Sequence, residues 1–256
     1  MVPIGNKKFK NRIYYLMAIF VKIKDFFIDL VFPKQCLDCG REGSYLCEDC
    51  KKKIELNPKF YCVICKTPTH WSTICQSCQN GFNLKAVWVA ADYNNKVLQE
   101  LIHCLKYKYL EEIADDLSDL VRQYIIENKI FVNFNLNNDN AIIVPVPLHK
   151  KRYLKRGFNQ SELLAKNISD YFGIGKRNLL VRKINTASQI NLKRAERQNN
   201  VKNAFVAIEP VDLSNKKVIL IDDVVTTGST LNECALALKD VGFEQIYGLV
   251  IAQREN

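Results

Sequence analysis

Apolar positions along the chain repeat with two different periods, which predict strands that alternate with helices. Short apolar runs predict buried strands at 85–92, 141–147, 216–222 and 245–252. Apolar residues spaced three and four apart predict amphipathic helices at 96–107 and 110–129, and further helices are expected at 159–173 and 229–241. This alternation favours an α/β fold with a mainly parallel sheet.

The beginning of the chain follows a different pattern. A basic stretch from Lys7 to Arg12 precedes a mostly apolar segment, 13–32, that charged residues interrupt. Its longest uncharged run, 13–21, covers about nine residues, whereas a membrane span needs roughly 20. We therefore expect an apolar helix, ended by Pro33, that docks on the protein itself or rests on a membrane surface or a partner.

Eight of the ten cysteines lie between residues 36 and 78, as four C-x-x-C pairs. The pairs are Cys36/Cys39, Cys47/Cys50, Cys62/Cys65 and Cys75/Cys78. Each such turn points two thiolates at one ion, and four thiolates complete a tetrahedral structural zinc site. The eight cysteines therefore predict two structural zinc ions and a reducing, cytoplasmic location. Spacing leaves open whether the pairs interleave, but the short spacers favour sequential pairing.

The cysteine segment also shapes the predicted domain organisation. It is too short to bury much apolar surface, so the metal should supply most of its folding free energy. We expect an N-terminal helix at 1–33, a zinc module at 34–82 and a larger domain at 83–256. The formal net charge of +10 falls to about +6 with eight thiolates and two zinc ions. A positive chain suits nucleic acid, a phosphorylated substrate or an anionic membrane surface.

The stretch "VILIDDVVTTGST", residues 218–230, sets two adjacent carboxylates at the end of a buried strand. Parallel strands deliver their last side chains to the crevice where α/β proteins bind ligands, so Asp222 and Asp223 predict ribose hydroxyls or a magnesium ion as partners. Small polar residues at 226–230 then open a helix whose first backbone N–H groups favour a phosphate. The stretch predicts a ribose 5-phosphate site, without a Walker loop or a G-x-G-x-x-G turn.

Basic residues gather in three places. The segment Lys150–Arg156 holds five basic residues of seven, with Tyr153 among them. The other two groups are Lys193, Arg194 and Arg197, and Lys176, Arg177, Arg182 and Lys183. Pyrophosphate needs only two or three donors, so the surplus, interleaved with aromatic residues, favours a track for single-stranded nucleic acid. A solvated basic surface is the alternative.

Several motifs of the chain resemble those of a known family. "VILIDDVVTTGST" is similar to the phosphoribosyl pyrophosphate (PRPP) motif of type I phosphoribosyltransferases. Over about residues 30–254 the chain resembles the ComF family of competence proteins. The motifs that carry this resemblance are "CLDCG", "LCEDC", "VPVPLHKKRYLKRGFNQSELLA" at 144–165 and "SQINLKRAERQNNVKNAF" at 188–205.

The resemblance implies a type I phosphoribosyltransferase-like parallel sheet flanked by helices, preceded by a small zinc-ribbon module. By position, Asp222 and Asp223 would meet the ribose hydroxyls with magnesium nearby. The residues implied for the 5′-phosphate are Thr226, Thr227, Gly228, Ser229 and Thr230. The candidates for pyrophosphate or nucleic acid are Lys150, Lys151, Arg152, Lys155, Arg156, Arg194 and Arg197. No general base is evident, and His103 and His149 are the candidates.

Two functions follow from this resemblance. The first is a cytoplasmic ComF-like protein of DNA uptake and natural transformation, which binds single-stranded DNA, carries a PRPP-type site and works with a helicase-like ATPase. It could contact the inner face of the membrane through its N-terminal helix. The second is an active phosphoribosyltransferase that releases pyrophosphate and has an unidentified acceptor. A phosphate site that only regulates DNA or partner binding is a third option.

Overall fold

The computed structural model describes residues 33–57, 59–184, 201–208 and 215–254. The chain divides into two compact units, Met1–Lys51 and Lys52–Asn256. The predicted N-terminal helix lies outside the described residues, as do Arg194 and Arg197. The second unit holds both the last four cysteines of the cysteine segment and the α/β sheet. The domain boundaries expected at residues 33 and 82 stay predictions.

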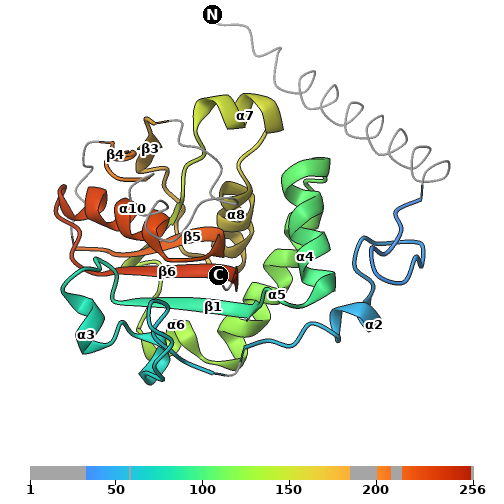
Figure 1. Cartoon of the computed structure of the whole chain (residues 1–256), viewed down its shortest axis with the longest axis horizontal. Coiled ribbons are helices and arrows are strands. Elements are labelled where there is room, and N and C mark those ends of the chain that lie inside the picture. Colours follow the sequence, from blue (N-terminus) through green and yellow to red (C-terminus); the bar gives the residue numbers. More distant parts are fainter. Residues whose placement is uncertain (1–32, 58, 185–200, 209–214, 255–256) are drawn as a thin grey trace, which may run out of the picture. The chain divides into compact units, whose positions relative to one another are not determined.

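Four parallel strands form the central sheet, in the order β1–β6–β5–β2. The first three of these strands are labelled in Figure 1. The sheet strands are β1 (Ala86–Asp92), β2 (Ala141–Pro145), β5 (Lys217–Val225) and β6 (Ile246–Gln253). A separate antiparallel pair joins β3 (Leu180–Arg182) to β4 (Phe205–Ala207). The predicted class, a parallel sheet flanked by helices, is confirmed.

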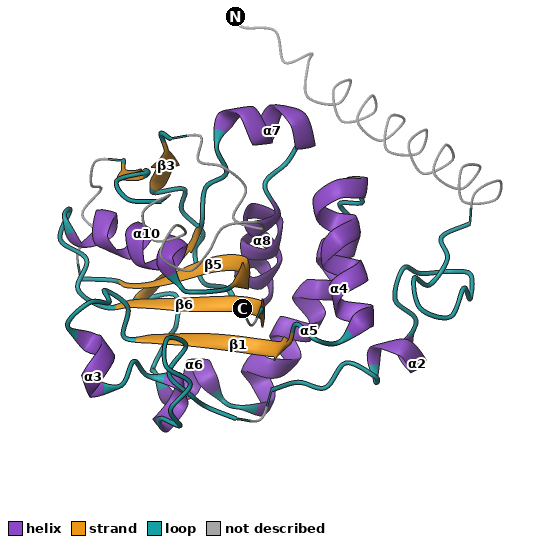
Figure 2. Ribbon diagram, in the orientation of Figure 1, coloured by secondary structure: helices purple, strands orange, loops and turns teal. Residues whose placement is uncertain are grey.

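Helices connect the strands and cover the sheet (Figure 2). The helices of the second unit are α3 (Gln76–Gln79), α4 (Lys96–His103), α5 (Ile113–Glu127), α6 (Ile130–Asn133), α7 (Lys150–Arg156), α8 (Gln160–Phe172) and α10 (Ser229–Lys239). A 3-10 turn spans His70–Ser72, and the π-helical η2 spans Cys104–Lys108. In the first unit, α2 spans Glu48–Lys51. Gly173 ends α8 with a φ of 66°, as expected of a glycine at that position.

Alternation along β5 divides its side chains between the two faces of the sheet. Val218 and Leu220 belong to a buried cluster that includes Leu231 and Leu238 of α10. The intervening Ile219 is also fully buried and points to the opposite face. Burial on both faces is typical of a parallel sheet between two helical layers. The rigid core therefore fixes where the carboxyl ends of the strands lie.

Strand β5 runs farther than the sequence pattern indicated. We expected it to end at Asp222, but it continues to Val225. The reason is pairing, because Val224 and Val225 lie in register with Ala252 and Gln253 of β6. Both aspartates are thus held by a hydrogen-bonded strand rather than by a free turn.

The segment that leads into β1 is joined to the sheet by backbone pairing. Leu56 forms an antiparallel bridge with Ala91, and Thr73 forms one with Ala86. The indole of Trp88 donates a hydrogen bond to the Trp71 carbonyl at 3.2 Å. Residues on both sides of Cys62 and Cys65 are therefore tied to β1.

Candidate functional site

The first metal centre lies in the N-terminal unit. Its four candidate ligands are Cys36, Cys39, Cys47 and Cys50, whose sulfur atoms all lie within 4.8 Å of one another. The Cys39 and Cys47 sulfur atoms are 3.6 Å apart. Zinc–sulfur bonds of about 2.3 Å in a tetrahedron place two sulfur atoms roughly 3.8 Å apart, so the cysteines fit zinc. The sequential pairing favoured by the short spacers is the pairing observed.

The candidate ligands of the second metal centre, Cys62, Cys65, Cys75 and Cys78, lie together in the same way. Cys65 and Cys75 sulfur atoms are 3.5 Å apart. Hydrogen bonds from the Thr67 side chain and backbone lower the pKa of Cys65 to about 6. The side-chain hydrogen bond with Cys75, followed by burial, raises the pKa of Cys78 to about 12. Crowded thiolates of this kind are stabilised by a divalent cation, which supports two structural zinc ions.

A cavity of about 350 Å³ opens at the carboxyl ends of the parallel strands. Asp222 and Asp223 line it from β5, and Thr226 and Thr230 line it from the loop and helix that follow. The sequence-predicted acidic pair and part of the predicted phosphate loop therefore share one cavity. It also contains five basic side chains, namely Lys106, Arg152, Arg156, Arg182 and Arg254. Five cations facing two carboxylates favour a ligand with several negative charges.

The two aspartates have different surroundings. Asp222 Oδ1 accepts hydrogen bonds from the Ser161 hydroxyl and the Asp223 backbone N–H, both at 2.9 Å. Burial, followed by the negative charge of Asp223, raises the pKa of Asp222 to about 7. Asp223 Oδ1 accepts from Lys106 Nζ at 2.8 Å and from the Val224 N–H at 2.6 Å. Asp223 is thus the ion-paired member, whereas the raised pKa of Asp222 lets its carboxyl keep a proton to a higher pH than an ordinary aspartate.

The loop between β5 and α10 turns sharply at Gly228. This residue has a φ of +79°, which favours glycine, and precedes the first residue of α10. A Cβ at this position would lie 2.7 Å from the ring of Phe82. The Thr227 and Ser229 hydroxyls are 2.7 Å apart. A compact loop with hydroxyls and helical N–H groups is suited to hold a phosphate.

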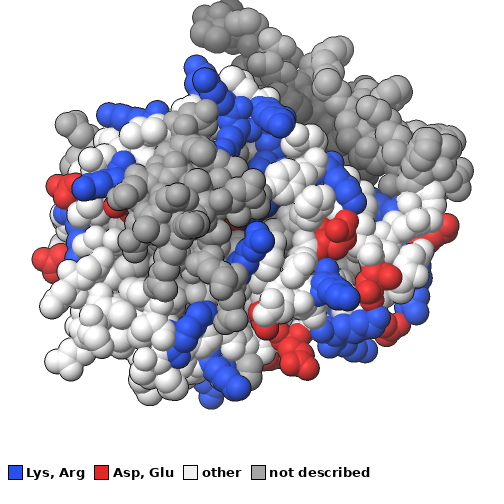
Figure 3. All heavy atoms as spheres, in the orientation of Figure 1, with Lys and Arg blue, Asp and Glu red and all other residues white. Residues whose placement is uncertain are grey.

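The basic segment after β2 forms a helix, α7, at a place where the apolar pattern predicted neither helix nor strand. Its N-cap is His149, whose Nδ1 accepts from the Lys151 N–H at 3.2 Å. Arg152 and Arg156 are one helical turn apart, are only partly exposed and line the cavity. The remaining five residues of α7 are exposed, namely Lys150, Lys151, Tyr153, Leu154 and Lys155. Figure 3 shows Lys and Arg side chains gathered over α7.

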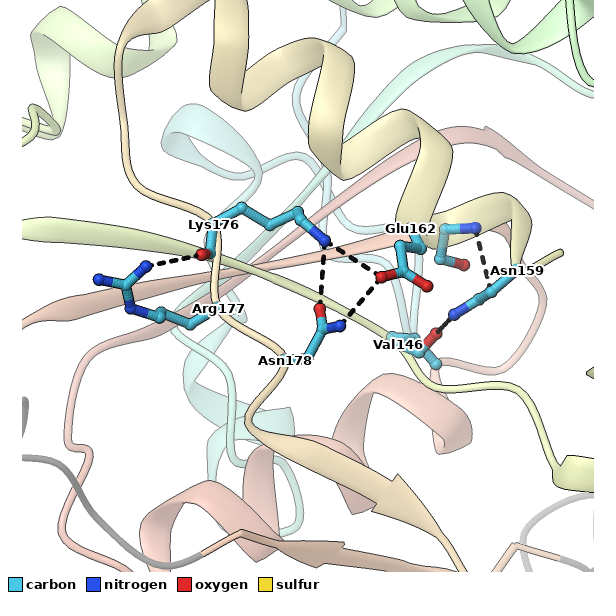
Figure 4. A network of polar contacts seen from close by, with 7 residues as sticks. Val146, Asn159, Glu162, Lys176, Arg177 and Asn178 are labelled. Atoms are coloured by element: carbon cyan, nitrogen blue, oxygen red, sulfur yellow. Dashed lines mark hydrogen bonds and ion pairs between the residues drawn. The ribbon is translucent and has the colours of Figure 1, made fainter. Parts of the chain in front are cut away.

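The start of α8 is fixed by a polar network (Figure 4). Asn159 caps the helix by accepting from the Ser161 N–H at 3.2 Å, and its amide donates to the Val146 carbonyl at 3.0 Å. Glu162 accepts from Asn178 at 2.9 Å and from Lys176 at 3.2 Å. These bonds anchor the turn that presents the Ser161 hydroxyl to Asp222. Lys176, assigned from the sequence to a basic group, is here paired with a carboxylate.

Several cavity residues were not found by sequence reasoning. Tyr93 and Arg254 follow the last residues of β1 and β6, so the rule that strand ends meet at one end of the sheet could have indicated them. Lys106 gave no such signal, because it lies within a helical segment. Of the two histidine candidates for a general base, His103 lines the cavity and His149 caps α7.

Comparisons with known proteins agree with these two parts of the chain. A family model described as a double zinc ribbon domain matches residues 27–79. A model described as a phosphoribosyl transferase domain matches residues 159–255. The first range includes all eight metal-centre cysteines, and the second includes the acidic pair and the loop that follows it.

Relatives that match most of the chain agree with the two family models. Competence protein F of Haemophilus influenzae is 32% identical over 86% of this chain and 98% of its own length. The DNA utilization protein YhgH of Escherichia coli is 34% identical over 75% of this chain and 83% of its own length. The competence protein ComFC of Bacillus subtilis is 25% identical over 77% of this chain and 79% of its own length.

None of the helices in the described ranges combines the length and the apolar character that a bilayer span requires.

Proposed function

Because this chain belongs to the ComF family of competence proteins, we propose that it handles single-stranded DNA in natural transformation and binds PRPP or a related sugar phosphate. The observation that carries the ligand proposal is the single cavity that contains the acidic pair, the start of α10 and five basic side chains. Few ligands other than a phosphorylated sugar would use all three. The relatives named for competence and DNA utilization support the DNA role.

The ligand would lie across the carboxyl ends of β5 and β2. Asp222 and Asp223 would accept hydrogen bonds from the ribose 2′ and 3′ hydroxyls, with magnesium beside their oxygen atoms. The loop at 226–230 would hold the 5′-phosphate with backbone N–H groups and hydroxyls. Arg152 and Arg156 would meet the pyrophosphate, since planar guanidinium groups bind phosphate oxygens in pairs.

Single-stranded DNA would use the outer face of α7. Lys150, Lys151 and Lys155 are exposed there, and Tyr153 and Leu154 are 45% and 73% exposed. Lysines can follow a phosphate backbone while an aromatic ring stacks on a base. Arg194 and Arg197, which we also proposed from the sequence, lie outside the described residues. We thus divide α7 into an inner arginine face for pyrophosphate and an outer lysine face for DNA.

A second candidate function is phosphoribosyl transfer, favoured by the basic side chains that line the cavity. Pyrophosphate would leave C1 of the sugar through a cationic transition state, and Arg152 and Arg156 would stabilise its developing charge. The protein would act mainly by positioning the two substrates. His103 is the one histidine among the residues that line the cavity. The acceptor is unidentified.

The remaining proposals rest on the family. A helicase-like ATPase partner and a cytoplasmic location follow from the resemblance and from the eight metal-centre cysteines. Peripheral contact with the inner face of the membrane would involve residues 13–32, which lie outside the described residues.

Calorimetry with PRPP and magnesium tests the ligand site directly. We expect the zinc-loaded protein to bind PRPP and the Asp222→Asn/Asp223→Asn variant to lose binding while it keeps its fold. Retained affinity in that variant would refute the site. Release of pyrophosphate in the presence of candidate acceptors would support the second candidate function, phosphoribosyl transfer.

Two variants of α7 separate its faces and serve as controls for each other. Arg152→Gln/Arg156→Gln should weaken PRPP binding and leave DNA affinity largely intact. Lys150→Glu/Lys151→Glu/Lys155→Glu should weaken single-stranded DNA binding and flatten its salt dependence, while PRPP binding stays. If the DNA affinity of the lysine variant depends on salt as it does in the unmodified protein, α7 is not part of the DNA-binding surface.

A further inference from the structure

Lys106 reaches the acidic pair from a part of the chain far from β5 in sequence. It lies in η2, the π-helical segment Cys104–Lys108 that continues α4. One π turn inserts a residue into a helix and turns the following side chains, and such turns are frequent at functional sites. Here Lys106 and Tyr107 of η2 form part of the cavity wall. His103, the last residue of α4, also lines the cavity.

The Lys106 ammonium is a close and mostly buried partner of Asp223. Its Nζ is 2.8 Å from Asp223 Oδ1, and the two side chains are 22% and 12% exposed. Burial works against the charged lysine, but the charges of Asp223 and Asp222 outweigh it and raise the pKa of Lys106. The lysine therefore remains a cation beside the carboxylate at which the ComF resemblance expects magnesium.

A divalent ion and the Lys106 ammonium would compete for Asp223 Oδ1. Magnesium binds carboxylate oxygens at about 2.0–2.1 Å and tolerates little distortion of its coordination. Asp223 Oδ1 already accepts two hydrogen bonds, from Lys106 Nζ and the Val224 N–H. The Val224 bond belongs to the backbone of β5, whereas the lysine side chain can move. A divalent ion at this oxygen would have to replace Lys106.

We propose that Lys106 and a divalent cation are alternative partners of Asp223, so that Lys106 sets the metal requirement of this site. The inference rests on the proposed sugar-phosphate site for its biological meaning. When a divalent ion binds Asp223, Lys106 moves toward the phosphate groups of the ligand. Those groups would lie within reach, because Arg152 and Arg156, proposed to bind the pyrophosphate, line the same cavity. When no divalent ion binds, the lysine keeps the acidic pair compensated, and the protein holds a phosphorylated sugar without added metal.

Binding of Mn²⁺ alone tests the competition without any ligand or turnover. We would titrate the zinc-loaded full chain with Mn²⁺ and follow the free ion by electron paramagnetic resonance. Lys106→Met should bind Mn²⁺ at least tenfold more tightly than the unmodified protein, and adding Asp223→Asn should abolish the gain. Lys166→Met is the control, because it removes an ammonium from a carboxylate, Asp170 at 3.2 Å, outside the cavity.

The outcomes separate this inference from the proposed function. Equal Mn²⁺ affinity in Lys106→Met and the unmodified protein would overturn the inference, even if PRPP binds. A gain that survives Asp223→Asn would overturn it as well. Absence of PRPP binding with the Mn²⁺ gain intact would overturn only the proposed ligand. Zinc content and thermal unfolding verify the fold, and Lys106→Gln gives a second, polar replacement with the same expected direction.

Discussion

The side-chain amide of Gln253, the last residue of β6, donates a hydrogen bond of 3.0 Å to the carbonyl of Val63, between two cysteines of the second metal centre. The same nitrogen lies 3.3 Å from the Thr226 carbonyl at the start of the phosphate loop. Gln253 is 4% exposed. One buried amide thus connects a metal centre to the loop proposed to hold the 5′-phosphate.

Replacing Gln253 by leucine should destabilise the protein and weaken PRPP binding together. The buried Val63 carbonyl and the partly buried Thr226 carbonyl would lose a donor, a loss of about 1–3 kcal/mol in the free energy of unfolding. Denaturant unfolding and calorimetry measure the two effects. Gln245→Leu is the matched control, because Gln245 precedes the other end of β6 and its side chain contacts only Tyr247 among the described hydrogen bonds. Equal effects of both changes would contradict the assigned connection.

The two metal centres should differ in their effect on ligand binding. Cys39→Ser and Cys65→Ser each change an exposed cysteine of one centre and should each lower zinc content from about two ions to about one. Only Cys65→Ser should also weaken PRPP binding, since Val63 and Gln253 connect the second centre to Thr226. Zinc analysis and calorimetry on the same samples test this. Similar losses of PRPP affinity in both variants would reject a special role for the second centre.

Gly228→Ala should destabilise the phosphate loop. Alanine at a φ of +79° carries a backbone penalty of about 1–2 kcal/mol. Its Cβ would also lie 2.7 Å from the Phe82 ring, so the ring must shift. We expect a lower melting temperature and weaker PRPP binding. Adding Phe82→Leu should recover only the steric part of the loss.

Gly81→Ala is the control for this pair, because nothing lies within 4 Å of a Cβ at Gly81 and its φ is not positive. A Gly228→Ala protein as stable as the Gly81→Ala protein would contradict the strained turn.

The raised pKa of Asp222 predicts a pH-dependent effect of Asp222→Asn. In the folded protein this pKa is about 7, against an ordinary value of 3.8. As pH rises from about 4 to 7, the unfolded chain releases this proton before the folded protein does, so the carboxyl lowers stability progressively. Asparagine carries no such charge. The melting temperature of Asp222→Asn relative to the unmodified protein should rise over this range and level off above about pH 7.

Thermal unfolding from pH 4 to 8 without added magnesium measures this difference. Asp170→Asn, which changes an exposed carboxyl on α8, should show no comparable trend. A difference that does not change with pH would mean that the Asp222 pKa is not raised.

Local patterns were sufficient to predict much of this fold and site. The acidic pair, the loop at 226–230 and the cysteine pairs are continuous in the sequence, so they could be proposed as sites without tertiary structure. Helix α7 was missed because five of its seven residues are basic and no apolar period marks it. Lys106 could not be found, because it is 117 residues from Asp223 and only the tertiary fold brings the two side chains together. The two faces of α7 could likewise be assigned only once the residues that line the cavity were known.

Strand β1 has a parallel neighbour, β6, on only one side, and on its other side it meets the bridges from Leu56 and Thr73. Those bridges come from the residues that flank the second metal centre. A fragment that began at residue 83 would lose them and expose an unpaired apolar strand, which is a template for pairing with other chains. The segment that carries the second metal centre therefore also protects the sheet against self-association. Loss of the metal from this centre would put the protein at risk of aggregation.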